Sequence, residues 1–206
     1  MRGAFIVLEG VDGAGKSTLL GRLLARVEAE RPGRVVRTAE PTRGPIGSEI
    51  RRRAVEGPPM APREELELFL ADRREHVAGV ITPALARGDV VLQDRYYLST
   101  AAYQAARPAL GLTPQDVVAL HAWAPRPDLV VLLDLPVERG LARVAGRGRG
   151  DAFEERALQE AVRANFLRLA AGDPTFVVLD ATAGQDALEA AAWSRVGPLV
   201  ARLAPA

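Results

Sequence analysis

The stretch GVDGAGKS, at residues 10–17, is the most informative part of this 206-residue sequence. It follows the apolar run Ala4–Leu8 and has the spacing G-x-x-x-x-G-K-[ST], which is typical of a phosphate-binding loop. Three glycines allow successive backbone N–H groups to point into one concavity, and a helix beginning near Lys16 would add its positive N-terminal end. The Lys16 ammonium suits the outer phosphates of a nucleotide, and the Ser17 hydroxyl suits Mg²⁺. The stretch therefore predicts a strand, an anion-binding loop and a helix, in that order.

Five short apolar runs have the composition of buried strands. Each is rich in Val, Ile or Leu and barely alternates with polar residues, as parallel strands covered on both faces do. They are Ala4–Leu8, Arg34–Arg37, Val90–Gln93, Leu129–Asp134 and Thr175–Asp180. A parallel sheet is therefore the expected centre of the fold.

Segments with helical periodicity separate these runs. The longest is Pro62–Arg87, which Pro83 should kink or break. Thr113-Pro114 is typical of a helix cap followed by a proline at the first helical position. The other predicted helices are Lys16–Glu30, Gln115–Trp123, Val137–Ala145, Glu154–Ala170 and Asp186–Leu203. The alternation predicts an α/β protein with the three-layer P-loop NTPase fold, a five-stranded parallel sheet flanked by helices, in a single domain over residues 1–206.

Composition excludes several classes of function. The sequence has 27 Lys and Arg against 26 Asp and Glu, so its net charge of +1 offers no general support for binding nucleic acid or a membrane surface. Cysteine is absent, which excludes disulfides and thiol catalysis and fits a reducing compartment. No apolar run approaches the roughly 18 residues of a membrane-spanning helix, and the N-terminus lacks a signal-peptide pattern. We expect a cytoplasmic protein without nucleic-acid or membrane partners.

Two charged residues stand directly after the third apolar run. In open parallel sheets, ligands bind beyond the carboxyl ends of the strands. An acidic residue at that place beside a P-loop usually serves Mg²⁺, so Asp94 is a predicted metal residue, acting directly or through the water shell of the ion. Arg95 could hold a second phosphate group through two parallel hydrogen bonds. The alternative interpretation of the two residues is a structural ion pair at the sheet edge.

Glycine and arginine alternate at residues 146–150, after the fourth apolar run and its helix. A flexible loop of this kind can close over a transferring phosphoryl group, where Arg147 and Arg149 would neutralise developing charge. A solvated basic surface loop is the alternative. Three more arginines occupy residues 51–53, and we expect Arg51 to point inward while the run otherwise forms a solvated helix face.

Several other residues say little by themselves. Phe69 and Arg73 share one face of a predicted helix and could stack on and hydrogen-bond a nucleobase, although a core phenylalanine beside a surface arginine is the simpler interpretation. His76 and His121, the only histidines, fit no metal or catalytic-triad pattern and are interpreted as ordinary helix residues. No Asn-Lys-x-Asp motif surrounds the single asparagine. The guanine motif of GTPases is therefore absent, and ATP is the expected nucleotide.

Seven short motifs occur along the chain, and the separations between them are informative. They are EGVDGAGKST (9–18), EPT (40–42), LFLADR (68–73), DRY (94–96), STAAYQ (99–104), RPDL (126–129) and DAFE (151–154). Together they resemble the motifs of thymidylate kinases, a family in the P-loop nucleoside monophosphate kinase group. The first motif alone indicates only a P-loop kinase, whereas the phenylalanine–arginine pair, DRY and STAAYQ are fairly specific to thymidylate kinases. The resemblance covers nearly the whole chain.

The resemblance implies Mg²⁺-dependent phosphoryl transfer from ATP to dTMP, giving ADP and dTDP, by a homodimer that associates through helix faces. The second pKa of the acceptor phosphate is about 6, so no general base is required. Catalysis is expected to be positioning and charge neutralisation. The implied catalytic residues are Lys16, Asp94, Arg95, Arg147 and Arg149. Some family members carry the catalytic arginine at the position of Gly13, so this chain resembles those that carry it in a lid, here about residues 146–153.

The resemblance also assigns the two substrates to residues. Phe69 would stack on thymine, Arg73 would hydrogen-bond its carbonyl edge, and Tyr103 would lie under the deoxyribose. The implied dTMP-binding residues are Asp12, Glu40, Arg51, Phe69, Arg73, Arg95, Thr100, Tyr103 and Gln104. The implied ATP-binding residues are Gly10, Val11, Asp12, Gly13, Ala14, Gly15, Lys16, Ser17, Thr18 and Arg143. Mg²⁺ is expected at Ser17 and, through water, at Asp94.

The sequence departs from the family pattern in two places that concern the site. The common Thr-Arg-Glu-Pro-Gly reads TAEPT at residues 38–42, and we expect Arg43 or Arg51 to replace the missing arginine. Ala152 stands where an arginine is frequent beside the lid. Two alternatives stay open, namely a kinase for another nucleoside or deoxynucleoside monophosphate and a nucleotide-binding protein without catalytic activity.

Overall fold

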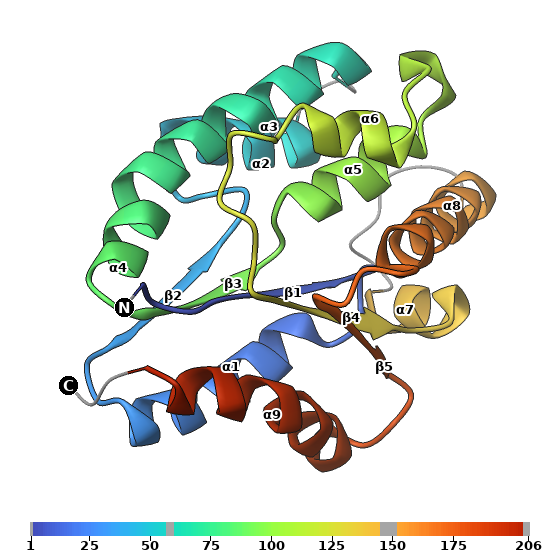
Figure 1. Ribbon diagram of the computed structural model, residues 1–206. Coiled ribbons are helices and arrows are strands. Elements are labelled where there is room, and N and C mark those ends of the chain that lie inside the picture. Colours follow the sequence, from blue (N-terminus) through green and yellow to red (C-terminus); the bar gives the residue numbers. More distant parts are fainter. Residues whose placement is uncertain (1, 57–59, 145–151, 204–206) are drawn as a thin grey trace.

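The computed structural model describes residues 2–56, 60–144 and 152–203. Within these ranges five parallel strands form one sheet in the order β2-β3-β1-β4-β5 (Figure 1). The strands are β1 (Phe5–Gly10), β2 (Val35–Ala39), β3 (Val90–Asp94), β4 (Leu129–Asp134) and β5 (Phe176–Asp180). The predicted class, a five-stranded parallel sheet flanked by helices, is confirmed.

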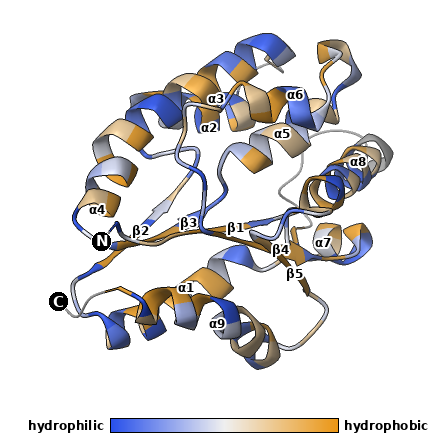
Figure 2. Ribbon diagram, viewed as in Figure 1, coloured by the Kyte–Doolittle hydropathy of each residue, from blue (hydrophilic) through white to orange (hydrophobic). Residues whose placement is uncertain are grey.

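Helices cover both faces of the sheet and give the fold three layers. α1 (Lys16–Glu30) and α9 (Gln185–Ala201) lie on one face, whereas α3 (Pro62–His76) and α8 (Ala152–Ala170) lie on the side of the other (Figure 1). The shorter helices are α2 (Pro45–Glu56), α4 (Thr82–Ala86), α5 (Tyr97–Ala105), α6 (Pro114–Ala119) and α7 (Val137–Val144). Hydrophobic residues dominate the central strands, as expected for a sheet that is covered on both faces (Figure 2).

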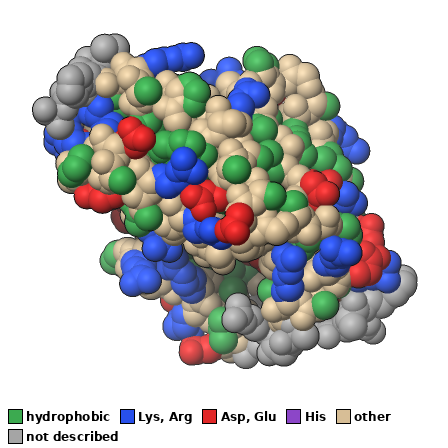
Figure 3. Space-filling model, turned by 90° about the horizontal axis from the view of Figure 1, so that it is seen from below, with side chains coloured by type: hydrophobic (Ala, Val, Ile, Leu, Met, Phe, Trp, Pro, Cys, Tyr) green, Lys and Arg blue, Asp and Glu red, His purple; other side chains and the backbone are tan. Residues whose placement is uncertain are grey.

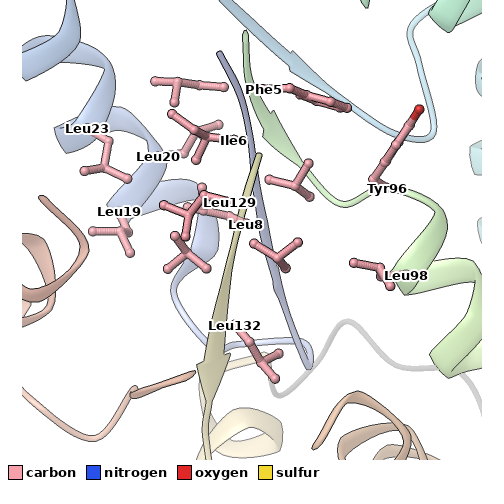
Figure 4. Close-up of a cluster of buried hydrophobic side chains, with 14 of the residues drawn as sticks. Phe5, Ile6, Leu8, Leu19, Leu20, Leu23, Tyr96, Leu98, Leu129 and Leu132 are labelled. Carbon is pink, nitrogen blue, oxygen red and sulfur yellow. The ribbon is translucent and has the colours of Figure 1, made fainter. Parts of the chain in front are cut away.

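The central strand β1 carries the loop of residues 10–17 to the carboxyl edge of the sheet. It pairs with β3 and β4, and Leu8 lies opposite Asp94 of β3. All six residues of β1 are buried, and Phe5 and Ile6 belong to the same core cluster as the leucines of α1 (Figure 4). The edge strands β2 and β5 are partly exposed, so burial on both faces holds for the three inner strands only.

A π-helical turn divides the segment that was predicted as one helix. α3 ends at His76, the turn covers Val77–Ile81, and α4 follows with Pro83 in its first turn. The ring of a proline crowds the carbonyl group four residues earlier, and a π-helical turn relieves such crowding with one extra residue.

α6 is shorter than the predicted helix Gln115–Trp123, because it ends at Ala119. The predicted cap is confirmed: the Asp116 N–H donates to Thr113 Oγ1 at 3.2 Å, and the Asp116 carboxylate accepts from the Thr113 N–H at 2.9 Å. The chain then leaves the helix in a series of turns. His121 consequently lies in a buried turn rather than on a helix, which corrects its interpretation as an ordinary helix residue.

Candidate active site

The three glycines of the loop that joins β1 to α1 all have positive φ angles, 142° at Gly10, 75° at Gly13 and 96° at Gly15. Residues with a side chain rarely adopt such angles. Gly13 also lies against α7, where a Cβ atom on Gly13 would come within 2.4 Å of the Gly140 carbonyl oxygen. An arginine at position 13 would therefore require α7 to move, so this loop is built without one.

Lys16 is the first residue of α1 and its side chain folds back over the loop. Its Nζ donates to the carbonyl oxygens of Gly10 and Val11, each at 2.9 Å, and the residue is buried. Burial, together with the nearby charge of Arg95, lowers the pKa of Lys16 to about 7, although three carboxylates oppose the shift. An anionic phosphate beside Nζ would favour the charged ammonium form.

Ser17 and Asp94 meet across the first turn of α1. Ser17 Oγ donates to Asp94 Oδ2 at 2.8 Å, so the hydroxyl and carboxylate predicted to serve Mg²⁺ are neighbours. Asp94 Oδ1 is buried and has no hydrogen-bond partner among the described residues. These oxygens fit Mg²⁺, which proteins usually bind through one or two carboxylates while water and phosphate complete its shell. In the described ranges no cluster of three or more His, Cys, Asp and Glu residues could hold a metal alone.

Arg95 has a φ angle of 63° and is the one non-glycine residue with positive φ in the described part of the chain. Such backbone strain is concentrated at functional sites and persists when neighbouring contacts fix it. Arg95 Nη2 donates to Asp12 Oδ1 at 2.6 Å, and Nη1 donates to Ser99 Oγ at 3.0 Å. Its guanidinium carbon lies 5.2 Å from the centre of the Tyr103 ring. The guanidinium is therefore held firmly between the loop and α5.

Glu9 is a functional candidate that sequence reasoning left without a role. It is fully buried at the end of β1, where its carboxylate accepts the N–H groups of Tyr96 and Ser99 and the Ser99 hydroxyl, at 2.9, 3.1 and 2.5 Å. It thereby caps α5, whose own preceding residue supplies no side-chain cap. Burial raises the pKa of Glu9 to about 7, against the hydrogen bond from Ser99 and the charge of Arg95. The available signal was an acidic residue directly before the loop.

Two cavities meet at Asp12 and Arg95. The first, called the acceptor cavity, measures about 210 Å³, and the second, called the loop cavity, about 780 Å³. Predicted dTMP-binding residues that line the acceptor cavity are Asp12, Glu40, Phe69, Arg73, Arg95, Thr100, Tyr103 and Gln104. Predicted ATP-binding residues that line the loop cavity are Asp12, Gly13, Gly15, Lys16, Ser17, Thr18 and Arg143. Gly10, Val11 and Ala14, which also belong to the loop, are buried and do not line the loop cavity.

The structure does not bring Arg51 into the acceptor cavity. Its guanidinium donates to the carbonyl oxygens of Pro41 and Thr42 and so braces the chain after Glu40. Arg51 lines a separate crevice, together with Arg43 and the Ser17–Asp94 pair. Seen from the side of α1 and α9, Lys and Arg side chains gather around a hollow in the surface (Figure 3). Arg51 thus shares a crevice with the predicted metal residues and does not line the predicted base site.

Arg73 is fully buried, so its interpretation as a surface arginine is wrong. Its Nε and Nη2 donate to Glu40 Oε2 at 2.8 and 2.6 Å, and Nη2 also donates to Thr100 Oγ1 at 3.0 Å. Glu40 Oε1 in turn accepts from His76 Nδ1 at 2.9 Å. Burial favours the neutral acid, but the charge of Arg73 and the contacts with His76 hold the pKa of Glu40 below its usual range.

Gln104 has a side-chain amide whose orientation is set by a carboxylate. Gln104 Nε2 donates to Glu65 Oε2 at 3.0 Å, and Arg107 also donates to this oxygen. Because a carboxylate only accepts, the amide nitrogen must face Glu65. Gln104 Oε1 is buried and has no hydrogen-bond partner among the described residues. Gln104, which lines the acceptor cavity, therefore keeps one side-chain oxygen that could still accept a hydrogen bond.

The predicted lid arginines, Arg147 and Arg149, lie outside the described residues, so their role stays a prediction. The helix before them is described, and in it Arg143 Nη1 donates to the Gly13 carbonyl oxygen at 3.0 Å. This contact ties α7 to the loop at the point of closest backbone approach.

Comparison with known proteins gives matches over nearly the whole chain. Residues 8–191 match the family model described as thymidylate kinase. The chain is 47% identical to a thymidylate kinase from Akkermansia muciniphila over 190 residues, which cover 92% of this chain and 89% of that protein. It is also 47% identical to a thymidylate kinase from Xanthomonas oryzae pv. oryzae over 189 residues, 90% of this chain and 79% of that protein.

Proposed function

Because this chain belongs to the thymidylate kinase family, we propose that it transfers a phosphoryl group from ATP to dTMP, giving ADP and dTDP. The observation that carries the proposal is the junction of two cavities at Asp12 and Arg95. The phosphate-binding loop lines the loop cavity, and the predicted dTMP-binding residues line the acceptor cavity. Arg95 lines both cavities, which supports a role for it in binding the acceptor phosphate beside the donor phosphates.

The polarity of the acceptor cavity supports a thymine base. Thymine offers carbonyl acceptors beside the N3–H donor, whereas cytosine replaces one carbonyl with an amino group. Arg73 can only donate, which suits a carbonyl oxygen, and Gln104 Oε1 is an unused acceptor that suits N3–H. A cytosine in the same place would set its amino group, a donor, against the donor groups of Arg73. Phe69 lines the same cavity and supplies a ring for stacking.

In the proposed reaction, catalysis consists of positioning and charge neutralisation. The acceptor phosphate has a second pKa of about 6, so it is largely ionised at neutral pH and needs no general base. Lys16 binds the donor phosphates, Arg95 binds the acceptor phosphate, and Arg147 with Arg149 closes over the transferring group. Ser17 and, through water, Asp94 would hold Mg²⁺, which would supply positive charge to neutralise the phosphates.

The proposed enzyme is a cytoplasmic homodimer. The proposal of a dimer rests on the family resemblance. The apolar helix around residues 66–77 could supply the interface, although Leu66 and Val77 themselves are buried within the single chain. None of the helices in the described ranges is both long and apolar enough to cross a membrane. Sedimentation velocity at micromolar concentration tests the dimer, and a monomer alone would refute it.

A coupled assay that follows ADP formation tests the proposed activity. Purified protein with ATP and Mg²⁺ is offered dTMP, dUMP, AMP, GMP and CMP in separate reactions. We expect the highest kcat/KM with dTMP. A higher value with another monophosphate would identify a different kinase of the same group. No turnover with any acceptor would indicate a nucleotide-binding protein without this catalytic activity.

A further inference from the structure

His121 contacts Arg73 but does not itself line the acceptor cavity. Its Nε2 atom is 2.6 Å from Arg73 Nη1, and both residues are almost completely buried. Arg73 lines the cavity, whereas His121 is not among the lining residues. The two residues are 48 positions apart in the chain, and His121 comes from the turn after α6. The hydrogen bond with Arg73 therefore connects the imidazole to a residue that lines the cavity.

The hydrogen bonds of His121 determine which ring nitrogen carries the proton. Nδ1 lies 2.7 Å from the Val117 carbonyl oxygen, which only accepts, so Nδ1 carries the hydrogen. Nε2 is then the acceptor of the neutral ring, and it accepts an N–H from Arg73 Nη1. Burial and the charge of Arg73 lower the pKa of His121 to about 4, although the Val117 contact and Glu40 oppose the shift. Protonation would place two cations in contact, so the neutral ring is the functional form.

The contacts of Arg73 leave one guanidinium hydrogen for a ligand. The side chain has five N–H groups, of which Glu40 takes two, Thr100 one and His121 one. The remaining N–H is on Nη1, the nitrogen that His121 holds. The bond to His121 therefore sets the direction of the one donor hydrogen that no described residue uses.

We propose that His121 is a positioning residue for pyrimidine recognition, which accepts a hydrogen bond from Arg73 and thereby orients the free N–H of that arginine toward a base carbonyl. This inference rests on the proposed dTMP kinase function. Glu40 already balances the charge of Arg73, so a second carboxylate behind the arginine would add an unpaired negative charge. A neutral acceptor is the group that satisfies the guanidinium without changing the net charge of the site.

A packing role is the competing explanation, because His121 also stacks on an aromatic ring. Its ring centre lies 5.7 Å from that of Tyr97, with an angle of 18° between the planes. Two substitutions separate the roles. His121→Phe keeps an aromatic ring beside Tyr97 but removes the acceptor. His121→Gln removes the ring but can place an amide oxygen near the position of Nε2.

Steady-state kinetics of the wild type and both variants, with dTMP, dUMP and ATP varied in turn, test the proposal. For His121→Phe we expect KM for dTMP to rise roughly 10- to 100-fold, because a buried donor on a charged group loses its acceptor. KM for dUMP should rise by the same factor, since both bases present the same carbonyl groups. KM for ATP should stay within about twofold, and His121→Gln should restore KM for dTMP to within about threefold of the wild type.

A cycle with Arg73→Ala completes the test. If His121 acts through Arg73, adding His121→Phe to Arg73→Ala should raise KM for dTMP by less than about twofold more. Circular dichroism checks folding, and if His121→Phe does not fold, the kinetics of His121→Gln decide. A normal KM in His121→Phe, or a His121→Gln variant as impaired as His121→Phe, would overturn the inference alone. A wild type that does not phosphorylate dTMP would instead overturn the proposed function, and the inference with it.

Discussion

Replacing Gly140 with alanine tests whether the loop and α7 are packed as closely as the structure indicates. A Cβ atom on Gly140 would lie 2.5 Å from the Asp12 carbonyl oxygen and 3.7 Å from Leu135 Cδ2. Contacts under 3.0 Å between such atoms do not persist, so the loop and the helix must separate by several tenths of an ångström. The variant should therefore displace Asp12, which lines both cavities.

Two opposing effects determine the stability of the Gly140→Ala variant. Alanine in a helix is favoured over glycine by about 1 kcal/mol. Overpacking a tightly packed contact destabilises by about 1–3 kcal/mol. We expect the packing effect to be the larger one. The free energy of unfolding of the variant should be about 1 kcal/mol lower than that of the wild type, and its KM for ATP should be several-fold higher.

Gly21 provides the matched control, because it is also a helical glycine and a Cβ atom there would meet nothing within 4 Å. Gly21→Ala should show the helix effect alone, a stabilisation of about 1 kcal/mol with KM values unchanged. For a chain of this size, 1 kcal/mol corresponds to a shift in Tm of about 2–4 °C, so differential scanning fluorimetry should separate the two variants. If Gly140→Ala were as stable as Gly21→Ala and bound ATP normally, the close approach of α7 to the loop would be wrong.

Three further predictions concern charges in the site. ATP binding near pH 7 should take up protons, because burial lowers the pKa of Lys16 to about 7 and an anionic phosphate favours its charged form. Calorimetry in buffers of different ionisation enthalpy measures the uptake; Lys16→Arg should reduce it, and no uptake in the wild type would contradict the prediction. Burial and the charge of Arg73 lower the pKa of His121 from 6.5 to about 4, so its contribution to stability is present above pH 6.5 and lost as the pH falls toward 4. In urea titrations over that window, the free energy of unfolding of the wild type should fall by up to about 3 kcal/mol more than that of His121→Gln. Equal losses in the two proteins would refute the argument that the ring is neutral. Arg147→Ala combined with Arg149→Ala should lower kcat by several orders of magnitude while changing dTMP affinity little, and an unchanged kcat would identify a solvated loop.

Local patterns predicted much of the fold. The predicted strands match the observed ones to within one or two residues, because uninterrupted apolar runs encode buried parallel strands directly. The helix boundaries were less accurate. α6 ends at Ala119, short of the predicted Trp123. The interruption expected at Pro83 is present as a π-helical turn just before it, but its form was not predicted.

The site residues also divide into features that the sequence predicted and features that only the structure shows. Motif spacing placed Lys16 in the phosphate-binding loop and placed Phe69 and Arg73 on one helix face, and the structure brings the latter two to a single cavity. Motif spacing did not predict the burial of Arg73 or the cap that Glu9 provides for α5. Those features join elements that are far apart in the chain, so no short window of sequence contains both partners.

Residues that are consecutive in the sequence therefore determined the strand, the loop and the helix around residues 10–17, since spacing along the chain is enough to specify that turn. Tertiary structure alone decided that His121 accepts from Arg73, that Glu9 holds the segment before Ser99, and that Gly13 has no room for a side chain. Each of these depends on a distance of a few ångströms between segments that only the packed sheet and its helices bring together.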